Sequence, residues 1–521
     1  MPIIIWLFHL VNNFIWLRLD TFPLLWDAGS YYLDSLILSD LLRHLSFFSF
    51  SQAIHVGGQY PPFVPFLAAL SYMIFGKSPD VAVFMVNGIF LGVLIFSVYA
   101  ITKKLSNKKT GLLAAFLITM YPIVFGHSRV LMYDLPVAAV VCLSVYLFLK
   151  SDNLKKSGYA LLWGVVLGIG LLTKFSFLLF AASALFYPGY KNFSGIKHKS
   201  RQIRNFLAAL FIAAALASIW YVPNFSRFLY AIFVYPETAR AVSLQTLGLA
   251  SFFYYFFALI NYQISFALFL AFILGLIYFL KARQKESLFL IFWIVFSYLG
   301  CTLTNYKSPR YTIPLLPAVA IICAIGLMSI RKKITRIAVV AIVVAIAMVE
   351  FFAYSYGIGL FVPLLKIDLP NALAAKLRVK SVILFDRKGG ENPLEQHTVF
   401  KQENWKTKEI IEAILNSGSD LKNRPADVFI IPDDPRIHAP LTALAYAKKI
   451  PITFTVASVE EMAKSKRDYV IIKDAKWMSP PYFDQFIKRS QIYFEANIDQ
   501  FSLVNKIILP DNSWLLIYKR K

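Results

Sequence analysis

Up to about Leu365 the chain alternates long apolar runs with short loops rich in lysine and arginine. A helix of about 17 to 25 apolar residues is long enough to cross the hydrocarbon core of a bilayer. The composition agrees, since 58% of residues are hydrophobic and only 16% are charged. We therefore predict a polytopic α-helical membrane protein with about eleven transmembrane helices. The predicted helices cover about 2–17, 80–102, 111–126, 135–149, 158–173, 175–190, 205–222, 263–280, 287–303, 311–330 and 337–361.

The basic loops set the predicted orientation. Their excess of lysine and arginine is typical of cytoplasmic loops. Alternation of the helices between them puts the N-terminus in the cytoplasm and everything after the last helix on the extracytoplasmic side. The same placement accounts for the formal net charge of +24, so we expect a lipid bilayer and no nucleic acid as a partner. The basic clusters lie near 103–109, 150–156, 191–204, 281–285 and 331–336.

Two long segments are predicted outside the membrane, at about 18–79 and 223–261. Each contains an apolar stretch too short to cross a bilayer comfortably. The first runs from Tyr60 to Gly76, and the second from Phe252 to Leu259. We interpret both as helices that lie on or re-enter the membrane.

The residues after the last predicted helix have the mixed composition of a soluble domain. Short apolar runs alternate there with polar helical stretches, which predicts a small α/β or α+β domain. The expected organisation is a transmembrane module over 1–365 and a soluble extracytoplasmic α/β domain over 366–521. Candidate strands are Ser381–Phe385, Val428–Ile431, Ile452–Val456, Tyr469–Ile472 and Trp514–Tyr518, and candidate helices are Lys408–Asn416 and Leu441–Lys449.

Acidic residues near the membrane are the first candidates for chemistry, because a charge there is costly without a partner or a wet cavity. Asp27 follows the first predicted helix and is a candidate general base toward an acceptor hydroxyl. The alternative is that Asp27 caps a helix. Asp134 begins the fourth predicted helix, where the helix dipole alone would favour it. Arg129 lies five residues earlier and is expected to pair with Asp134 or to face a phosphate.

Basic residues at the predicted outer face are candidates for binding an anion. Lys174 lies between two apolar runs, where it either neutralises a lipid phosphate or simply extends to the interface. Lys307 and Arg310 occupy an outer loop, against the usual preference for basic residues inside. His55 and His127 stand without the spacing of a metal site. We predict no metal and no cofactor, although a divalent cation held by Asp27 and Asp134 stays open.

Several short motifs occur in order along this predicted outer face. They are Trp26-Asp27 with Tyr31-Tyr32, Tyr60-Pro61-Pro62, Phe75-Gly76, Ser128-Arg129 with Asp134, Gly168 through Lys174, and Lys307 through Pro317 with Arg310-Tyr311. Their order and spacing over about 1–330 resemble the polytopic GT-C superfamily glycosyltransferases. Within that superfamily the chain looks like the branch of protein O-mannosyltransferases and the lipid A aminoarabinose transferase. The resemblance does not extend to the tail.

The resemblance implies a transferase that moves a sugar from a polyprenyl-phosphate-linked donor to a lipid, glycan or protein acceptor outside the cytoplasm. It assigns the base of an inverting reaction to Asp27, although Ala28 replaces a second acidic residue that the family often has there. Asp34 is the fallback base, and Asp134 would orient the acceptor or the sugar. The residues implied near the donor and its phosphate are Tyr60, Arg129, Lys174, Lys307, Arg310 and Tyr311.

Two other functions remain open from the sequence. A membrane transporter would usually show internal repeats or charged, broken mid-membrane helices, and neither is clear here. A non-catalytic scaffold that binds the lipid carrier is the second alternative, and Ala28 gives it some support. A function has to be argued from a site rather than from a fold. The arrangement of the candidate residues therefore decides among the transferase, the transporter and the scaffold.

Overall fold

The structure is a computed structural model of the full chain. It describes residues 1–44, 46–58, 60–193, 200–234, 248–282, 288–304, 307–357, 364–377, 379, 381–386, 401–418, 425–431, 434, 436–455, 468–474, 489 and 492–521.

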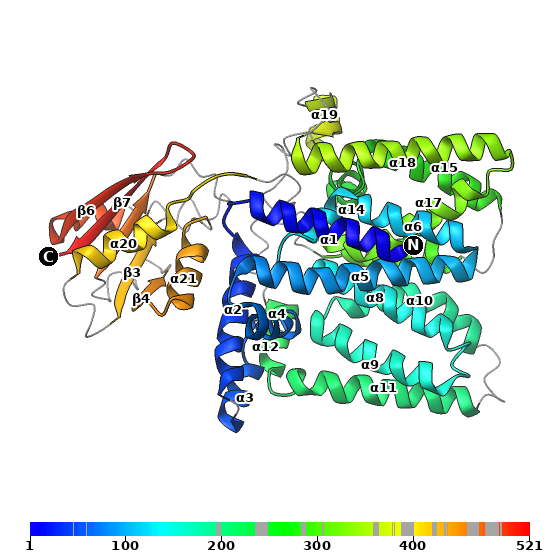
Figure 1. The fold of residues 1–521 in the computed structure, drawn as a ribbon, viewed down its shortest axis with the longest axis horizontal. Helices are drawn as coiled ribbons and strands as arrows, with labels where there is room; N and C mark the ends of the chain where they lie inside the picture. The colour runs from blue at the N-terminus through cyan, green and yellow to red at the C-terminus, as the bar shows by residue number, and fades with distance from the viewer. Residues whose placement is uncertain are drawn as a thin grey trace. The chain divides into compact units, whose positions relative to one another are not determined.

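The described residues form two compact units (Figure 1). The first unit contains those of Met1–Leu17 and Leu41–Val399 and is mainly helical. The second contains those of Arg18–Asp40 and Phe400–Lys521 and includes a five-stranded sheet. A short segment after the first helix therefore belongs with the distant C-terminal part of the chain. The domain boundary at 365/366 stays a prediction.

In the part of the chain that the structure describes, all eleven predicted membrane segments are mainly helical, while residue 287 and residues 358–361 of two of them lie outside this part. Within the described residues, five helices are long and apolar enough to cross a membrane, and a sixth candidate is a bent pair of helices. The protein is an integral membrane protein, and the total of eleven crossings stays a prediction. The helices are α1 (Pro2–Leu19), α5 (Pro79–Leu105), α6 (Lys108–Met120), α7 (Pro122–His127), α8 (Asp134–Lys150), α9 (Ser157–Thr173), α10 (Phe177–Phe193), α11 (Ser200–Tyr221), α15 (Phe266–Lys281), α16 (Phe289–Thr302), η6 with α17 (Pro309–Leu315, Leu316–Met328) and α18 (Lys333–Tyr356).

Two of these segments contain a break in the helix. The predicted helix at 111–126 splits into α6 and α7, because Pro122 cannot continue the hydrogen-bond pattern of α6 and instead begins α7. The bent pair joins Leu249–Gln263, which comprises α14 (Leu249–Ala258) and η4 (Leu259–Gln263), to α15 at an angle of 117°. Ser265 lies at this bend with a φ of 68°, a strained value for a residue other than glycine.

The helices of the first unit pack against one another in pairs. α5 packs against α6 and α8, α9 packs against α8 and α11, and α15 packs against α17. The last pair approaches closely at Gly326, where an added Cβ would overlap the carbonyl oxygen of Gly275. Small residues at such a crossing let two helix backbones approach, which is how membrane helices gain packing energy.

Further helices occupy the two segments predicted outside the membrane. Helices are confirmed for both short apolar stretches, in α4 (Phe63–Phe75) and α14, while their interfacial position stays a prediction. The other helices in these segments are α2 (Trp26–Arg43), α3 (Phe47–Ile54), α12 (Phe225–Leu229) and η2 (Tyr230–Val234).

The second unit contains a mixed sheet in the order β4-β3-β5-β7-β6. β4, β3 and β5 are parallel, and β5, β7 and β6 are antiparallel. The predicted strands at 428–431, 469–472 and 514–518 are confirmed, and so are both predicted helices. The predicted strand at 452–456 is confirmed over 452–455, and residue 456 lies outside the described residues. The elements are β3 (Ala426–Ile431), β4 (Ile452–Thr455), β5 (Tyr469–Lys473), η7 (Ile498–Gln500), β6 (Phe501–Ile508), β7 (Trp514–Arg520), α20 (Thr407–Ser417) and α21 (His438–Ala447).

A separate antiparallel pair precedes this sheet in the chain and belongs to the first unit. It consists of β1 (Leu364–Asp368) and β2 (Ser381–Asp386), with α19 (Asn371–Leu377) between them. The predicted strand at 381–385 is therefore confirmed as a strand but lies outside the main sheet.

Strand β3 of the five-stranded sheet is buried on both faces. Along β3, Val428 and Ile430 face one apolar core, and Phe429 and Ile431 face another. The first core contains residues of α20 and α21, while Phe494 and Phe501 contribute to the second. A central strand of a parallel sheet that is covered on both sides shows this near-continuous apolar sequence.

Candidate functional site

Three of the predicted site residues come together in the first unit. Asp134 is the first residue of α8, Lys174 ends α9, and Arg310 lies in η6. The Lys174 Nζ atom is 3.0 Å from Asp134 Oδ1, and the Arg310 Nε atom is 3.9 Å from Asp134 Oδ2. We call this group the Asp134 centre. It exists because α8 packs against both α9 and η6, so that residues distant in sequence meet at the start of α8.

Aromatic rings surround the two cations. Lys174 Nζ lies 5.3 Å from the ring centre of Tyr60 and 5.2 Å from that of Tyr311, and the Arg310 guanidinium lies 5.4 Å from Tyr311. Tyr60 in turn stacks on Phe175, with ring centres 5.6 Å apart. The faces of these rings attract cations and limit the water around them. Tyr60 and Tyr311 are thus placed with Lys174 and Arg310, and their predicted role beside the donor stays a prediction.

The Asp134 centre combines one acidic and two basic side chains. The carboxylate faces both cations, and all three side chains are buried. The Arg310 guanidinium also contacts the sulfur of Met132, at 3.6 Å from a terminal nitrogen. Buried cations are stabilised by anions beside them. The centre is therefore suited to binding an anion such as a phosphate, and a guanidinium suits phosphate oxygens in particular.

Lys307 precedes this region in the loop after α16. Its Nζ donates to the carbonyl oxygens of Thr302 and Thr304, each at 2.8 Å, and of Cys301 at 3.4 Å. The Tyr255 ring centre lies 5.5 Å away. Burial lowers the pKa of Lys307 from its ordinary value to about 8. The amine therefore helps hold the loop together and loses its proton close to physiological pH.

Arg129 lies in a different polar group, between α1 and α18. Its Nε donates to Asn13 Oδ1 at 3.2 Å, and a terminal nitrogen donates to Ser355 Oγ at 2.8 Å. The guanidinium also lies within 5.5 Å of three ring centres. These contacts join the start and the end of the helical unit, and the expected pairing of Arg129 with Asp134 or a phosphate stays a prediction. The three rings are those of Trp16, Phe125 and Phe351.

Asp27 lies in the second unit, as the second residue of α2. The helix that follows brings a further carboxylate, Asp34, two turns along. Burial raises the pKa of Asp34 from its ordinary value to about 6, which is suitable for a general base near neutral pH. The assignment of the base to Asp27, with Asp34 as the fallback, stays a prediction.

Two further buried polar residues are His127, which the sequence considered only as a metal ligand, and Glu350, which it missed. His127 ends α7, which packs against η4, η6 and α8, and neither of its ring nitrogens has a hydrogen-bond partner among the described residues. Glu350 lies inside α18 and accepts a hydrogen bond from Ser265 at 2.8 Å. Its isolation within a long apolar run was the available signal, because an ionisable residue there marks a site by default.

The described residues contain no group of three or more histidine, cysteine, aspartate or glutamate side chains placed to hold a metal ion. A cation held by Asp27 and Asp134, which the sequence left open, stays a hypothesis.

Two solved structures of ArnT from Cupriavidus metallidurans share the fold of the whole chain. The apo form matches with a TM-score of 0.61 at 14% identity, covering 99% of this chain and 97% of ArnT. The form bound to undecaprenyl phosphate matches equally well, at 13% identity. The family model described as dolichyl-phosphate-mannose-protein mannosyltransferase matches residues 59–223. The chain has the fold of ArnT, and the family match over residues 59–223 supports the predicted GT-C relationship.

Two further proteins are similar to the chain. The archaeal oligosaccharyltransferase AglB from Archaeoglobus fulgidus, solved with an inhibitory peptide and a dolichol-phosphate, has a TM-score of 0.52 at 13% identity. That match covers 98% of this chain and 74% of AglB. An uncharacterized protein of Aquifex aeolicus (strain VF5) is 25% identical over 382 residues, which are 70% of this chain and 71% of the relative. The predicted resemblance to the GT-C superfamily and the predicted fold class are confirmed.

Proposed function

We propose that the protein is a glycosyltransferase that uses a polyprenyl-phosphate-linked sugar donor. The observation that carries the proposal is the buried Asp134 centre, in which Lys174 and Arg310 converge on one carboxylate. Such a centre suits the phosphate of a lipid carrier. Support comes from the shared fold, since ArnT has been solved with undecaprenyl phosphate and AglB with a dolichol-phosphate.

In the proposed reaction, Lys174 and Arg310 stabilise the leaving phosphate. The bond between the anomeric carbon and the phosphate oxygen breaks, and its electron pair stays on the phosphate. Fixed cations beside that oxygen are more effective in a buried site than in water. Asp134 holds both cations in place, and Tyr60 and Tyr311 restrict water around them.

Asp27 is the proposed general base. It takes the proton of the acceptor hydroxyl while the acceptor oxygen forms the new bond to the anomeric carbon. A single displacement from the face opposite the phosphate inverts the configuration at that carbon. Asp34 is the second candidate for this role, because its pKa near 6 leaves it ionised at neutral pH.

We propose that transfer takes place on the extracytoplasmic side, with the N-terminus in the cytoplasm. This orientation follows from the basic loops at the opposite ends of the predicted helices. The acceptor is proposed only by class, as a hydroxyl of a lipid, a glycan or a protein.

The reaction is tested by incubating the purified protein with radiolabelled polyprenyl-phosphate sugars and a membrane fraction that supplies acceptors. Wild type is compared with Asp27→Asn and with Asp34→Asn, which removes a charge from the same helix. We expect label transfer by wild type and Asp34→Asn, and a loss of at least about a hundredfold in Asp27→Asn, as for removal of a general base.

The outcomes separate the parts of the proposal. Transfer lost only in Asp34→Asn would move the base to Asp34 and keep the reaction class. Movement of a solute across liposomes by a wild-type protein that transfers no sugar would instead support a transporter.

A further inference from the structure

The segment that leads into Asp27 pairs with the chain just before α20. The Thr21 backbone nitrogen donates to the carbonyl oxygen of Lys401 at 2.9 Å, and the Lys401 nitrogen donates to Asp20 Oδ1 at 2.7 Å. The Thr21 hydroxyl also donates to the Lys401 carbonyl at 3.3 Å. These bonds join residues separated by some 380 positions and fix the backbone at the entry to α2.

Phe22 extends this pairing into the core of the second unit. Its ring packs against the apolar core formed by β3, α20 and α21 and makes an edge contact with Trp405, with ring centres 6.2 Å apart. The Lys401 Nζ atom covers the same ring at 4.5 Å. Trp405 is itself fixed by a hydrogen bond from its indole nitrogen to Glu403 Oε2 at 3.0 Å.

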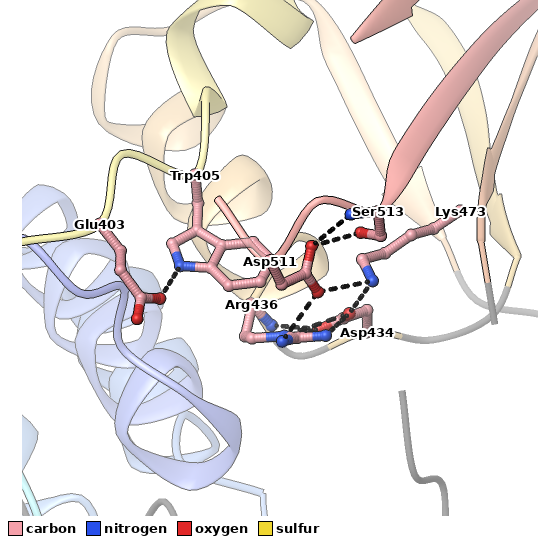
Figure 2. Close-up of polar contacts among 7 residues, drawn as sticks. All are labelled: Glu403, Trp405, Asp434, Arg436, Lys473, Asp511 and Ser513. Carbon is pink, nitrogen blue, oxygen red and sulfur yellow. Dashed lines mark hydrogen bonds and ion pairs between the residues drawn. The ribbon is translucent and has the colours of Figure 1, made fainter. Parts of the chain in front are cut away.

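Behind Trp405 lies an ion network, which Figure 2 shows and which consists of Asp434, Arg436, Lys473 and Asp511. Arg436 contacts Asp434 at 2.6 Å and Asp511 at 3.3 Å. Lys473 contacts the same two carboxylates at 3.2 and 3.4 Å. Each cation thus bridges both anions, the charges cancel, and Asp434 and Lys473 are completely buried. A closed, neutral network of this kind fixes geometry without requiring a ligand.

The network joins the sheet to Trp405 through one side chain. Lys473 ends β5, Asp434 follows β3, and Asp511 lies in the turn between β6 and β7. The Arg436 guanidinium stacks on the Trp405 ring at 4.2 Å, so the orientation of the indole depends on the network (Figure 2). Contacts therefore run without interruption from the sheet through Arg436 and Trp405 to Phe22.

A second contact holds the chain on the other side of Asp27. Gly29 lies so close to α21 that an added Cβ would be 2.6 Å from the Cβ of Ala439. Phe22 is five residues before Asp27 and Gly29 is two residues after it. Both ends of this short stretch are thus fixed to the C-terminal part of the second unit.

We infer that the C-terminal α/β part of the second unit positions the Asp27 segment, with Trp405 and the ion network acting as positioning groups for the catalytic base. The inference rests on the proposed function for its catalytic consequence. This positioning gives the tail a part in the reaction that does not involve binding the acceptor. The sequence alone did not assign the tail a role.

Hydrogen exchange of the full-length protein tests the positioning without relying on activity. Trp405→Ala removes the ring between Phe22 and Arg436, whereas Trp405→Phe keeps an aromatic surface. Phe494→Ala is the matched control, because it removes a buried aromatic ring from the opposite face of the same sheet. We expect the amides of Ala28 to Leu33 to exchange about tenfold faster in Trp405→Ala only.

Turnover is measured on the same variants beside Asp27→Asn. We expect Trp405→Ala to lower kcat about tenfold or more while its affinity for undecaprenyl phosphate stays at the wild-type value, since a misplaced base affects the chemical step. Trp405→Phe should restore most of the activity.

Equal exchange rates in Trp405→Ala and Phe494→Ala would overturn the positioning itself. Faster exchange with an unchanged kcat would overturn its role in the reaction. Full turnover by Asp27→Asn would remove the proposed base and this inference with it, whereas an inactive Asp27→Asn beside a fully active Trp405→Ala would overturn the inference alone.

Discussion

At the scale of single residues, the sequence identified the members of the Asp134 centre, because a charged side chain near lipid is energetically costly and therefore marks a candidate site. It did not predict their contacts, since Asp134, Lys174 and Arg310 are far apart in sequence and meet only through helix packing. The sequence named His127 but assigned it no role, for the opposite reason. A lone histidine has no informative spacing, and its burial beside α8 depends on the break at Pro122.

The Asp134 carboxylate offsets two buried cations, so its removal should destabilise the protein. We expect Asp134→Asn to cost about 3 to 5 kcal/mol, as for a broken buried ion pair. The free energy can be followed as a lower thermal unfolding temperature in detergent. Asp152→Asn makes the same chemical change at an exposed position and serves as the control. An equal unfolding temperature in the two variants would contradict the assigned role of Asp134.

The pKa of Lys307 predicts how carrier binding depends on pH. Below a pH of about 8 the amine is protonated, as its predicted role beside the carrier phosphate requires, and above it the amine is neutral. The affinity for undecaprenyl phosphate should therefore fall as the pH rises through about 8. Lys307→Arg keeps its charge throughout this range and should remove the dependence. Titrations of both proteins that follow the same pH profile would show that Lys307 is not one of the phosphate-binding cations.

At the scale of elements, apolar length predicted the membrane helices well and proline changed one of them. The described residues of all eleven segments are mainly helical because long apolar runs have few alternatives in lipid. The separation of α6 from α7 at Pro122 was missed, as was the whole of α2, whose three aspartates interrupt any apolar run. The strand β6 was also missed, because its alternation is weak and it is held by pairing with β7.

The crossing of α15 and α17 depends on the absence of a side chain at Gly326. We expect Gly326→Ala to destabilise the protein by about 1 to 3 kcal/mol or more, because the added methyl group would overlap the backbone of Gly275. Gly158→Ala is the control, since nothing lies within 4 Å of its added Cβ in α9. Both can be compared by thermal unfolding in detergent. Equal effects would mean that the two helices can move apart at little cost.

At the scale of the whole molecule, composition divides the chain into a membrane part and a soluble tail but does not reveal how the two are connected. The strand order β4-β3-β5-β7-β6 is set by pairings between distant segments. No local pattern in residues 18–40 shows that they join this unit, because the contacts of Phe22 and Gly29 are made with residues some 380 to 410 positions away. The GT-C resemblance was carried by motifs in the membrane part, whereas the fold shared with ArnT extends over the whole chain.

The carrier-phosphate site is tested most directly by native mass spectrometry of the detergent-solubilised protein with undecaprenyl phosphate. Wild type is compared with Arg310→Gln and with Arg227→Gln, which removes an exposed arginine from α12. We predict one bound carrier lipid in wild type and Arg227→Gln, and an affinity about ten- to a hundredfold lower in Arg310→Gln, as for loss of a hydrogen bond to a charged group. No binding by wild type, or equal binding by well-folded preparations of both variants, would contradict a phosphate site at the Asp134 centre.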